Sequence, residues 1–145
     1  MPKFTKTTVV MLLMLLALSL SSAAAGPSRQ EGKYSVAGID DERAVEKFLA
    51  DLQEAVAQDD RARVASMLSY PLTLHSGKRR TVLRRKSDLL KKYGVVFNRK
   101  VKDALAKQKA SELFANWQGV MIGDGAIWFG EVGGAGQLKV VAVNN

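Results

Sequence analysis

Three segments rich in β-branched and aromatic residues fill the last third of the chain, and they limit its fold more than any other feature. They cover residues 117–122, 126–132 and 138–143, and this composition favours strands. A Gly-Asp-Gly turn at residues 123–125 separates the first two, and an Asp-Gly pair between apolar segments is a strong hairpin signal. A glycine-rich segment at residues 133–136 joins the second pair. The sequence therefore predicts three consecutive antiparallel strands.

A strong helical pattern precedes these strands. Asp40 or Asp41 can cap the helix, and carboxylates are favoured in a first turn. Its apolar side chains recur every three or four positions and form a single stripe. The stripe consists of Val45, Phe48, Leu49, Leu52 and Val56.

The middle of the chain alternates short elements. Proline disfavours a helical conformation in the residue before it, and Ser and Asn are good helix caps. The predicted elements are a short helix through Met67 and Leu68 that ends at Pro71, strands over residues 72–74 and 79–84, and helices capped by Ser87 and Asn98. Together these elements predict an α+β domain with N-terminal helices packed on a curved antiparallel sheet that ends in a β-meander.

Neighbouring residues in the predicted strands are both apolar, as in Ile127-Trp128 and Val140-Val141. Apolar side chains therefore leave both faces of the sheet, whereas a solvated face would alternate with polar residues. Either other parts of the same chain cover both faces of these strands, or their outer face contacts a second copy of the chain. We favour a homodimer.

The N-terminal 25 residues have the order of a secretory signal peptide. Lys3 and Lys6 precede an apolar run at residues 9–20, and Ala23 and Ala25 form an A-x-A cleavage site. An uncleaved membrane anchor is the alternative, but the run is shorter than the roughly 20 residues that span a bilayer. We therefore predict an exported protein, periplasmic or extracellular, whose mature part has no transmembrane segment. Its divisions are a signal peptide (residues 1–25), a flexible leader (26–40) and one domain (41–145).

Composition excludes several function classes. The chain has no cysteine and one histidine, which argues against disulfides, a lipid-modified cysteine and a transition-metal site. No glycine-rich loop opens a helix as a phosphate loop would. The sequence thus predicts no metal and no cofactor.

Positive charge is concentrated in one segment. The formal net charge is +8, and it becomes +6 when Lys3 and Lys6 are removed. Residues 78–109 hold thirteen basic and two acidic residues. Such a segment is either a solvated face or a contact for an anionic component of the cell envelope, while the export signal argues against nucleic acid. The candidate contacts are Lys78, Arg79, Arg80, Arg84, Arg85, Lys86, Lys91, Lys92, Arg99, Lys100 and Lys102.

The order of elements resembles the nuclear-transport-factor-like superfamily, which includes the SnoaL-like cyclases and steroid isomerases. Residues 117–129 and 139–143 also resemble exported bacterial members without an assigned activity. The resemblance covers about residues 41–145 and implies a cone-shaped, cystatin-like domain whose helices close a curved sheet around an apolar cavity. It also implies dimerisation through the sheet. It assigns no catalytic residue, because no charged residue of these strands matches a cavity base.

Two sets of residues are candidates for a site. His75 could act as a general base with Tyr70 as donor, but no acid is placed to orient the imidazole, and we interpret His75 as an exposed strand-end residue. Six large side chains could line a pocket for a small apolar ligand or could be plain core. They are Tyr93, Phe97, Trp117, Met121, Trp128 and Phe129.

The sequence favours an exported, non-enzymatic binding or accessory domain with an apolar cavity and a basic surface. Two alternatives stay open. One is an isomerase, dehydratase or hydrolase that uses His75 or a buried carboxylate. The other is a structural subunit that docks through its sheet face.

Overall fold

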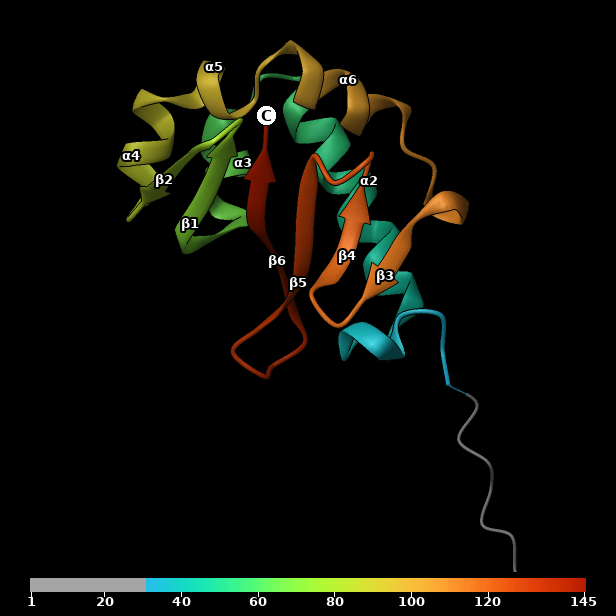
Figure 1. The fold of residues 1–145 in the computed structure, drawn as a ribbon. Helices are drawn as coiled ribbons and strands as arrows, with labels where there is room; N and C mark the ends of the chain where they lie inside the picture. Colours follow the sequence, from blue (N-terminus) through green and yellow to red (C-terminus); the bar gives the residue numbers. More distant parts are fainter. Residues whose placement is uncertain (1–30) are drawn as a thin grey trace, which may run out of the picture. The chain divides into compact units, whose positions relative to one another are not determined.

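A layer of helices packs on one six-stranded sheet (Figure 1). The computed structural model describes residues 31–145, and its core extends from Tyr34 to Val143. The predicted signal peptide, and the first five residues of the predicted leader, lie outside the described residues. The helical elements are η1 (Ser35–Ala37), α2 (Glu42–Ala57), α3 (Arg61–Ser66), α4 (Lys86–Lys91), α5 (Tyr93–Val96), α6 (Arg99–Lys107) and η2 (Ala110–Glu112). The strands are β1 (Leu68–Ser76), β2 (Arg79–Leu83), β3 (Phe114–Asn116), β4 (Gly119–Ile122), β5 (Ile127–Val132) and β6 (Gln137–Asn144).

The sheet is mixed, with the strand order β2-β1-β6-β5-β4-β3. The α+β class and the antiparallel meander β4-β5-β6 are confirmed. The prediction of an entirely antiparallel sheet is wrong, because β1 and β6 are parallel. The reason is topological: the chain leaves edge strand β2, passes through α4, α5 and α6, and enters the sheet again at the opposite edge. Three reversals then bring β6 beside β1 in the same direction.

Helix α2 begins where the sequence predicts. The Asp41 carboxylate accepts hydrogen bonds from the backbone N–H groups of Arg43 and Ala44, at 3.0 and 3.1 Å. These groups have no partner within the helix, so the cap stabilises its first turn. All five residues of the predicted stripe are buried. The cap of α6 is confirmed in the same way, since Asn98 Oδ1 accepts from Val101 N at 3.0 Å.

Three local predictions need correction. Leu68 belongs to β1 rather than to the preceding helix, and the strand continues through Pro71. Helix α4 begins one residue before Ser87, because the Asp88 carboxylate accepts hydrogen bonds from the backbone N–H groups of Arg84 and Arg85 and fixes the turn there. Trp117 lies in the tight turn between β3 and β4, and β3 itself was not predicted.

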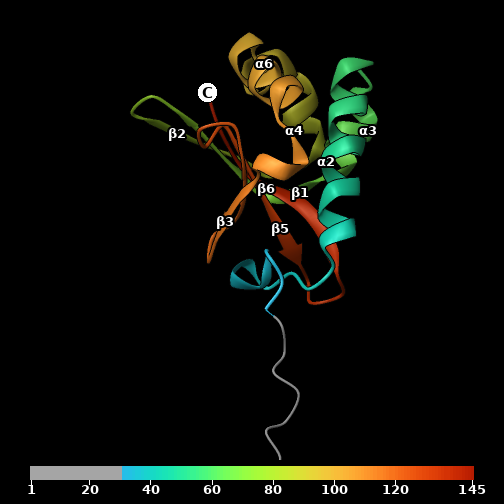
Figure 2. The ribbon, with the colours of Figure 1, turned by 90° about the vertical axis from the view of Figure 1, so that its right-hand side faces the viewer.

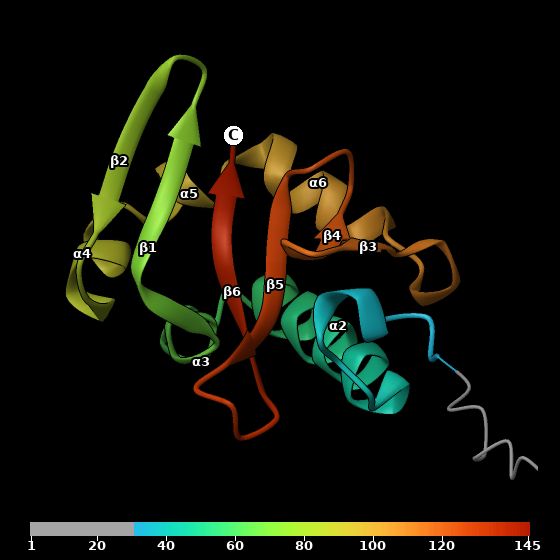
Figure 3. The same cartoon turned by 60° about the horizontal axis from the view of Figure 1, so that its bottom comes forward.

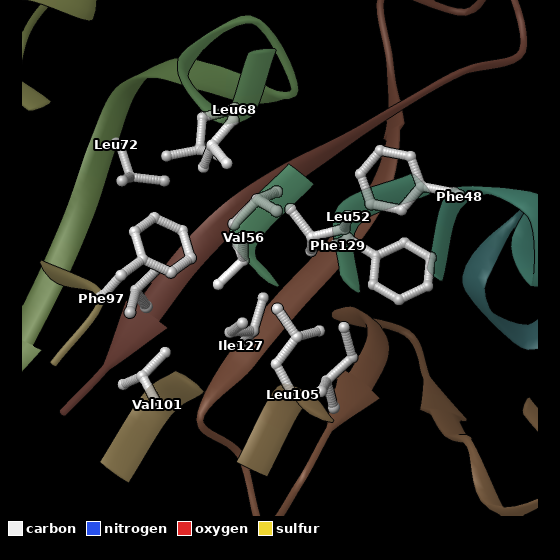
Figure 4. Close-up of a cluster of buried hydrophobic side chains, with 14 of the residues drawn as sticks. Phe48, Leu52, Val56, Leu68, Leu72, Phe97, Val101, Leu105, Ile127 and Phe129 are labelled. Atoms are coloured by element: carbon white, nitrogen blue, oxygen red, sulfur yellow. The ribbon is translucent and has the colours of Figure 1, made fainter. Parts of the chain in front are cut away.

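The core fills the space between the helices and one face of the sheet. Viewed edge-on, helices α2, α3, α4 and α6 lie on the same side of the strands (Figure 2). The Phe48 ring of α2 lies 4.8 Å from the Phe129 ring of β5. Side chains from α2, β1, α6 and β5 meet in the same cluster (Figure 4). The helix layer therefore covers one sheet face and leaves the other open.

Candidate functional site: the basic edge and the open sheet face

Eight exposed cations gather on edge strand β2, the two turns beside it and the short helix α4, and we call this set the basic edge. Strand β2 and helix α4 lie next to each other at one side of the molecule (Figure 3). An edge strand has backbone groups without a strand partner, and cations along it oppose pairing with another chain. The basic edge consists of Lys78, Arg79, Arg80, Arg84, Arg85, Lys86, Lys91 and Lys92.

The charge of the basic edge is almost uncompensated. Asp88 is the one acid between residues 78 and 92, and its carboxylate already accepts two backbone hydrogen bonds at the start of α4. Its ion pair with Arg85 has an N···O distance of 3.9 Å. Within the described part of the chain, the other seven cations lie beyond 4.0 Å of any carboxylate oxygen. Their charge is therefore available to an anionic partner.

The remaining three predicted contact residues lie on α6, where two of them form ion pairs and the third lines a cavity. Arg99 Nε lies 3.8 Å from Asp103 Oδ2, and Lys102 Nζ lies 3.9 Å from Asp59 Oδ1. Lys102 Nζ also stands 5.6 Å from the centre of the Tyr93 ring. Lys100 lines a cavity at the end of the sheet. The basic segment of the sequence thus divides into an edge with one ion pair among eight cations and a helix in which two of the four cations are paired.

The structure places His75 and Tyr70 in different surroundings. They lie five residues apart on β1, and a strand rises about 3.3 Å per residue. The His75 side chain is exposed on the open face, opposite Arg80 on β2 and Asn144 on β6. Among the described residues no carboxylate pairs with its imidazole. The Tyr70 hydroxyl donates to Ala65 O at 3.0 Å, and burial raises the pKa of Tyr70 to about 12, so this tyrosine holds β1 to α3.

The six predicted pocket residues separate into three places. Tyr93 and Phe97 are buried in the core with their rings stacked 5.2 Å apart, and Phe129 is buried against Phe48. Trp117 is 81% exposed in the β3–β4 turn. The other two, Met121 and Trp128, are half-buried and paired on the open face of the sheet. The structure therefore does not bring this set together around one cavity.

Tyr93 occupies an unusual position within the core. Its hydroxyl is buried and has no hydrogen-bond partner among the described residues. The Arg61 guanidinium lies 4.9 Å from the ring centre. Burial raises the pKa of Tyr93, and the negative charge of Asp59 adds to this effect. The neutral phenol is thus the form that the fold favours.

Surface cavities lie around α6 and the β4–β5 turn. One of about 440 Å³ lies between α6 and the end of β6, and exposed Lys100 and Asp124 contribute to its lining. Another, of about 380 Å³, includes Met121 and Gln108. Gln108 Oε1 accepts a hydrogen bond from Gly123 N at 2.7 Å and so holds the turn against α6. These cavities are open and mixed in polarity, and they do not contain the aromatic residues predicted to bind a ligand.

The open face carries one residue from each strand in a continuous line, which we call the apolar row. Residues directly opposite each other on paired strands share a face. Its two ends are exposed, and the four residues between them are half-buried. In sheet order the row is Val82, Thr73, Ala142, Trp128, Met121 and Phe114.

The sequence predicted apolar residues on both faces of the sheet, but it did not predict which residues form the apolar row. Val82 and Phe114 were not predicted as part of it, because the row depends on strand register and on the unpredicted strand β3. The alternation of Arg80 and Val82 was a signal for one end. A bulge that leaves Val141 out of the β5 pairing shifts the register and places Ala142 in line with Trp128.

The described residues contain neither a metal-binding cluster nor a membrane-spanning helix. Histidine, aspartate and glutamate side chains form no group of three that could hold a metal ion there. None of the helices in that part of the chain has the length and apolar composition to cross a membrane. Comparison with family models, with curated proteins and with solved structures gives no match for this chain.

Proposed function

We propose that this protein is an exported binding domain, without catalytic activity of its own, whose basic edge contacts an anionic component of the cell envelope. The observation that carries the proposal is the gathering of eight exposed cations on β2, α4 and the turns beside them, seven of them without an ion pair in the described residues. The exported location is supported by the signal-like order of residues 1–25. The separation of His75 from Tyr70 supports a role in binding rather than catalysis.

The expected strength of binding to an anionic surface follows from electrostatics. Each lysine or arginine near an anionic surface contributes about 1 kcal/mol, and the attraction falls off within the Debye length of about 8–10 Å. Eight cations at one edge can therefore approach such a surface together, whereas the paired cations of α2, α3 and α6 are already compensated. Binding should be strong at low salt and weak at high salt.

The test uses Glu31–Asn145, which contains the whole described core, and immobilised anionic polymer or anionic vesicles as probes. A first variant replaces Arg79, Arg80, Lys91 and Lys92 with glutamine. A matched variant replaces four exposed cations outside the basic edge with glutamine, so it has the same net charge as the first variant. These cations are Arg43, Lys47, Lys100 and Lys107. Removing four contacts of about 1 kcal/mol each should weaken binding several hundredfold in the first variant and less than tenfold in the second.

Two outcomes would contradict the proposal. Equal losses in the two variants would show that net charge alone, and not the basic edge, drives binding. Binding that does not change between 0.05 and 0.5 M salt, or no binding at low salt, would remove the electrostatic contact altogether.

A second function is favoured by the apolar row, namely docking through the open sheet face to a second copy of the chain. The row crosses all six strands, which at about 4.8 Å per strand is roughly 24 Å, a width suited to a standard protein interface. Ala142→Arg places a charge at its centre, and Gln137→Arg places the same charge on β6 outside the row. Light scattering should give a dimer for the parent and for Gln137→Arg, and a monomer for Ala142→Arg. A monomeric parent at 100 μM would reject the dimer.

A further inference from the structure

Two exposed aliphatic side chains stand among the cations at the end of the basic edge. Leu90 is 43% exposed and Val95 is 57% exposed. They cannot turn inward, because the neighbouring positions Leu89 and Val96 already fill the core with 0% exposure. On α4, Lys86 precedes Leu90 by four residues and so lies on the same helix face. The segment thus presents charge and apolar surface side by side.

A partner that matches this surface offers anionic groups and an apolar region within a few ångströms of each other. A lipid leaflet has this property, since its headgroup phosphates lie directly above the acyl chains. Lysine and arginine can keep their charges at the phosphates while their aliphatic stems lie deeper. A purely ionic polymer offers nothing to Leu90 and Val95. Single-stranded nucleic acid is recognised by exposed aromatic platforms, but Tyr93, the aromatic residue of this segment, is buried.

We infer that the basic edge docks on an anionic lipid surface, with the Leu90 and Val95 side chains entering the boundary between headgroups and acyl chains. The inference rests on the proposed function and names its partner. Helices α4 and α5 have six and four residues, too short to lie in the membrane as an independent amphipathic helix. The contact is therefore peripheral and reversible. The folded domain holds the two side chains in place, and the cations supply most of the attraction.

The absence of cysteine from the chain makes a direct test possible. Leu90→Cys and Val95→Cys each allow one environment-sensitive dye to be attached, and Ala135→Cys provides a control at an exposed position of the β5–β6 turn. The experiment uses Glu31–Asn145, because residues 9–20 are themselves apolar and would bind vesicles independently. The probes are vesicles of phosphatidylcholine with and without 30% phosphatidylglycerol.

We expect a blue shift and a severalfold rise in emission for dyes at positions 90 and 95 on anionic vesicles, and no change for the dye at 135. Neutral vesicles should change none of the three. Binding to anionic vesicles without a shift at 90 and 95 would overturn the insertion while leaving the basic-edge contact standing. No binding to vesicles together with salt-sensitive binding to an anionic polymer would assign the edge to a polymer. No binding to either probe would overturn both proposals.

A second variant separates insertion from charge. The double substitution Leu90→Ser and Val95→Ser keeps every cation and removes the apolar contact. Its affinity for anionic vesicles should fall about tenfold, while its affinity for a soluble anionic polymer such as polyglutamate stays within twofold of the parent. Because both side chains are exposed, the substitutions should leave the fold intact, and circular dichroism checks this. Equal affinities of parent and variant for vesicles would contradict insertion.

Discussion

The two faces of the sheet carry similar side chains in very different surroundings. On the helix-covered face, Val120, Phe129 and Val140 have no exposed surface. One residue away along the strands, Met121 and Trp128 lie on the open face and keep part of their surface in water. Burial from water is the main source of stability, so the covered face accounts for most of it. The open face has apolar surface left for a partner.

The largest difference between the faces is expected for their neighbouring aromatic residues. Phe129→Ala removes a fully buried ring that packs 4.8 Å from the Phe48 ring, and it should lower the free energy of unfolding by about 3–5 kcal/mol. Trp128→Ala on the open face should cost about 1–2 kcal/mol, since the side chain is only half-buried. Urea denaturation of Glu31–Asn145 at low micromolar concentration measures both values. Equal losses would mean that the open face is covered after all.

The next largest loss of stability is expected at Gly119, where the backbones of β4 and β5 approach each other closely. Gly119 has a φ of 131°, and a Cβ added there would lie 2.5 Å from the Phe129 carbonyl oxygen. Gly119→Ala should therefore cost about 2–4 kcal/mol, because strand β4 must move away from β5. Gly134→Ala is the matched control: its φ is 67°, but a Cβ would meet no atom within 4 Å. The control should cost about 1 kcal/mol, and a loss for Gly119→Ala no greater than this would contradict the contact.

Tyr70 gives the covered side a pH dependence. Burial raises its pKa to about 12, above the value of about 10 in an unfolded chain. The folded state therefore binds the proton more tightly, so this stabilisation is complete below pH 10 and is lost as the pH rises from about 10 to about 12. Tyr70→Phe removes the hydrogen bond to Ala65 O and should lower the free energy of unfolding by about 1 kcal/mol at pH 7. Its unfolding free energy should fall less steeply than that of the parent above pH 10, and parallel curves would contradict the assignment.

Local chemistry made about half of the fold predictable. The Asp41 and Asn98 caps, the stripe of α2 and the turn at residues 123–125 all depend on near neighbours in the sequence. The parallel pairing of β1 with β6 depends on long-range topology that no local pattern contains. The position of Phe114 in the apolar row has the same origin.

The candidate site was predictable to a similar extent. The sequence located the positive charge, but the separation of the basic edge from α6 required the structure, because Lys102 meets Asp59 from a distant turn. The exposure of Leu90 beside buried Leu89 likewise follows from tertiary packing. Sequence therefore identified the charged segment, and folding determined which of its cations stay unpaired.

The smallest expected effect comes from an isosteric substitution on the open face, compared with the same substitution in the core. Val82→Thr changes a 46% exposed residue on edge strand β2, whose cross-strand neighbour Thr73 is already a threonine. The new hydroxyl can remain in water, so the free energy of unfolding should change by less than about 0.5 kcal/mol. Val143→Thr introduces the same hydroxyl into the core, where Val143 has no exposed surface, and should cost about 1–3 kcal/mol. Both variants make the same change from valine to threonine. The difference between their losses of unfolding free energy therefore measures how far each position is exposed to water. If Val82→Thr became costly only at high protein concentration, a second copy would be covering that end of the apolar row. If it were costly at every concentration, the contrast between an open and a covered face would be wrong.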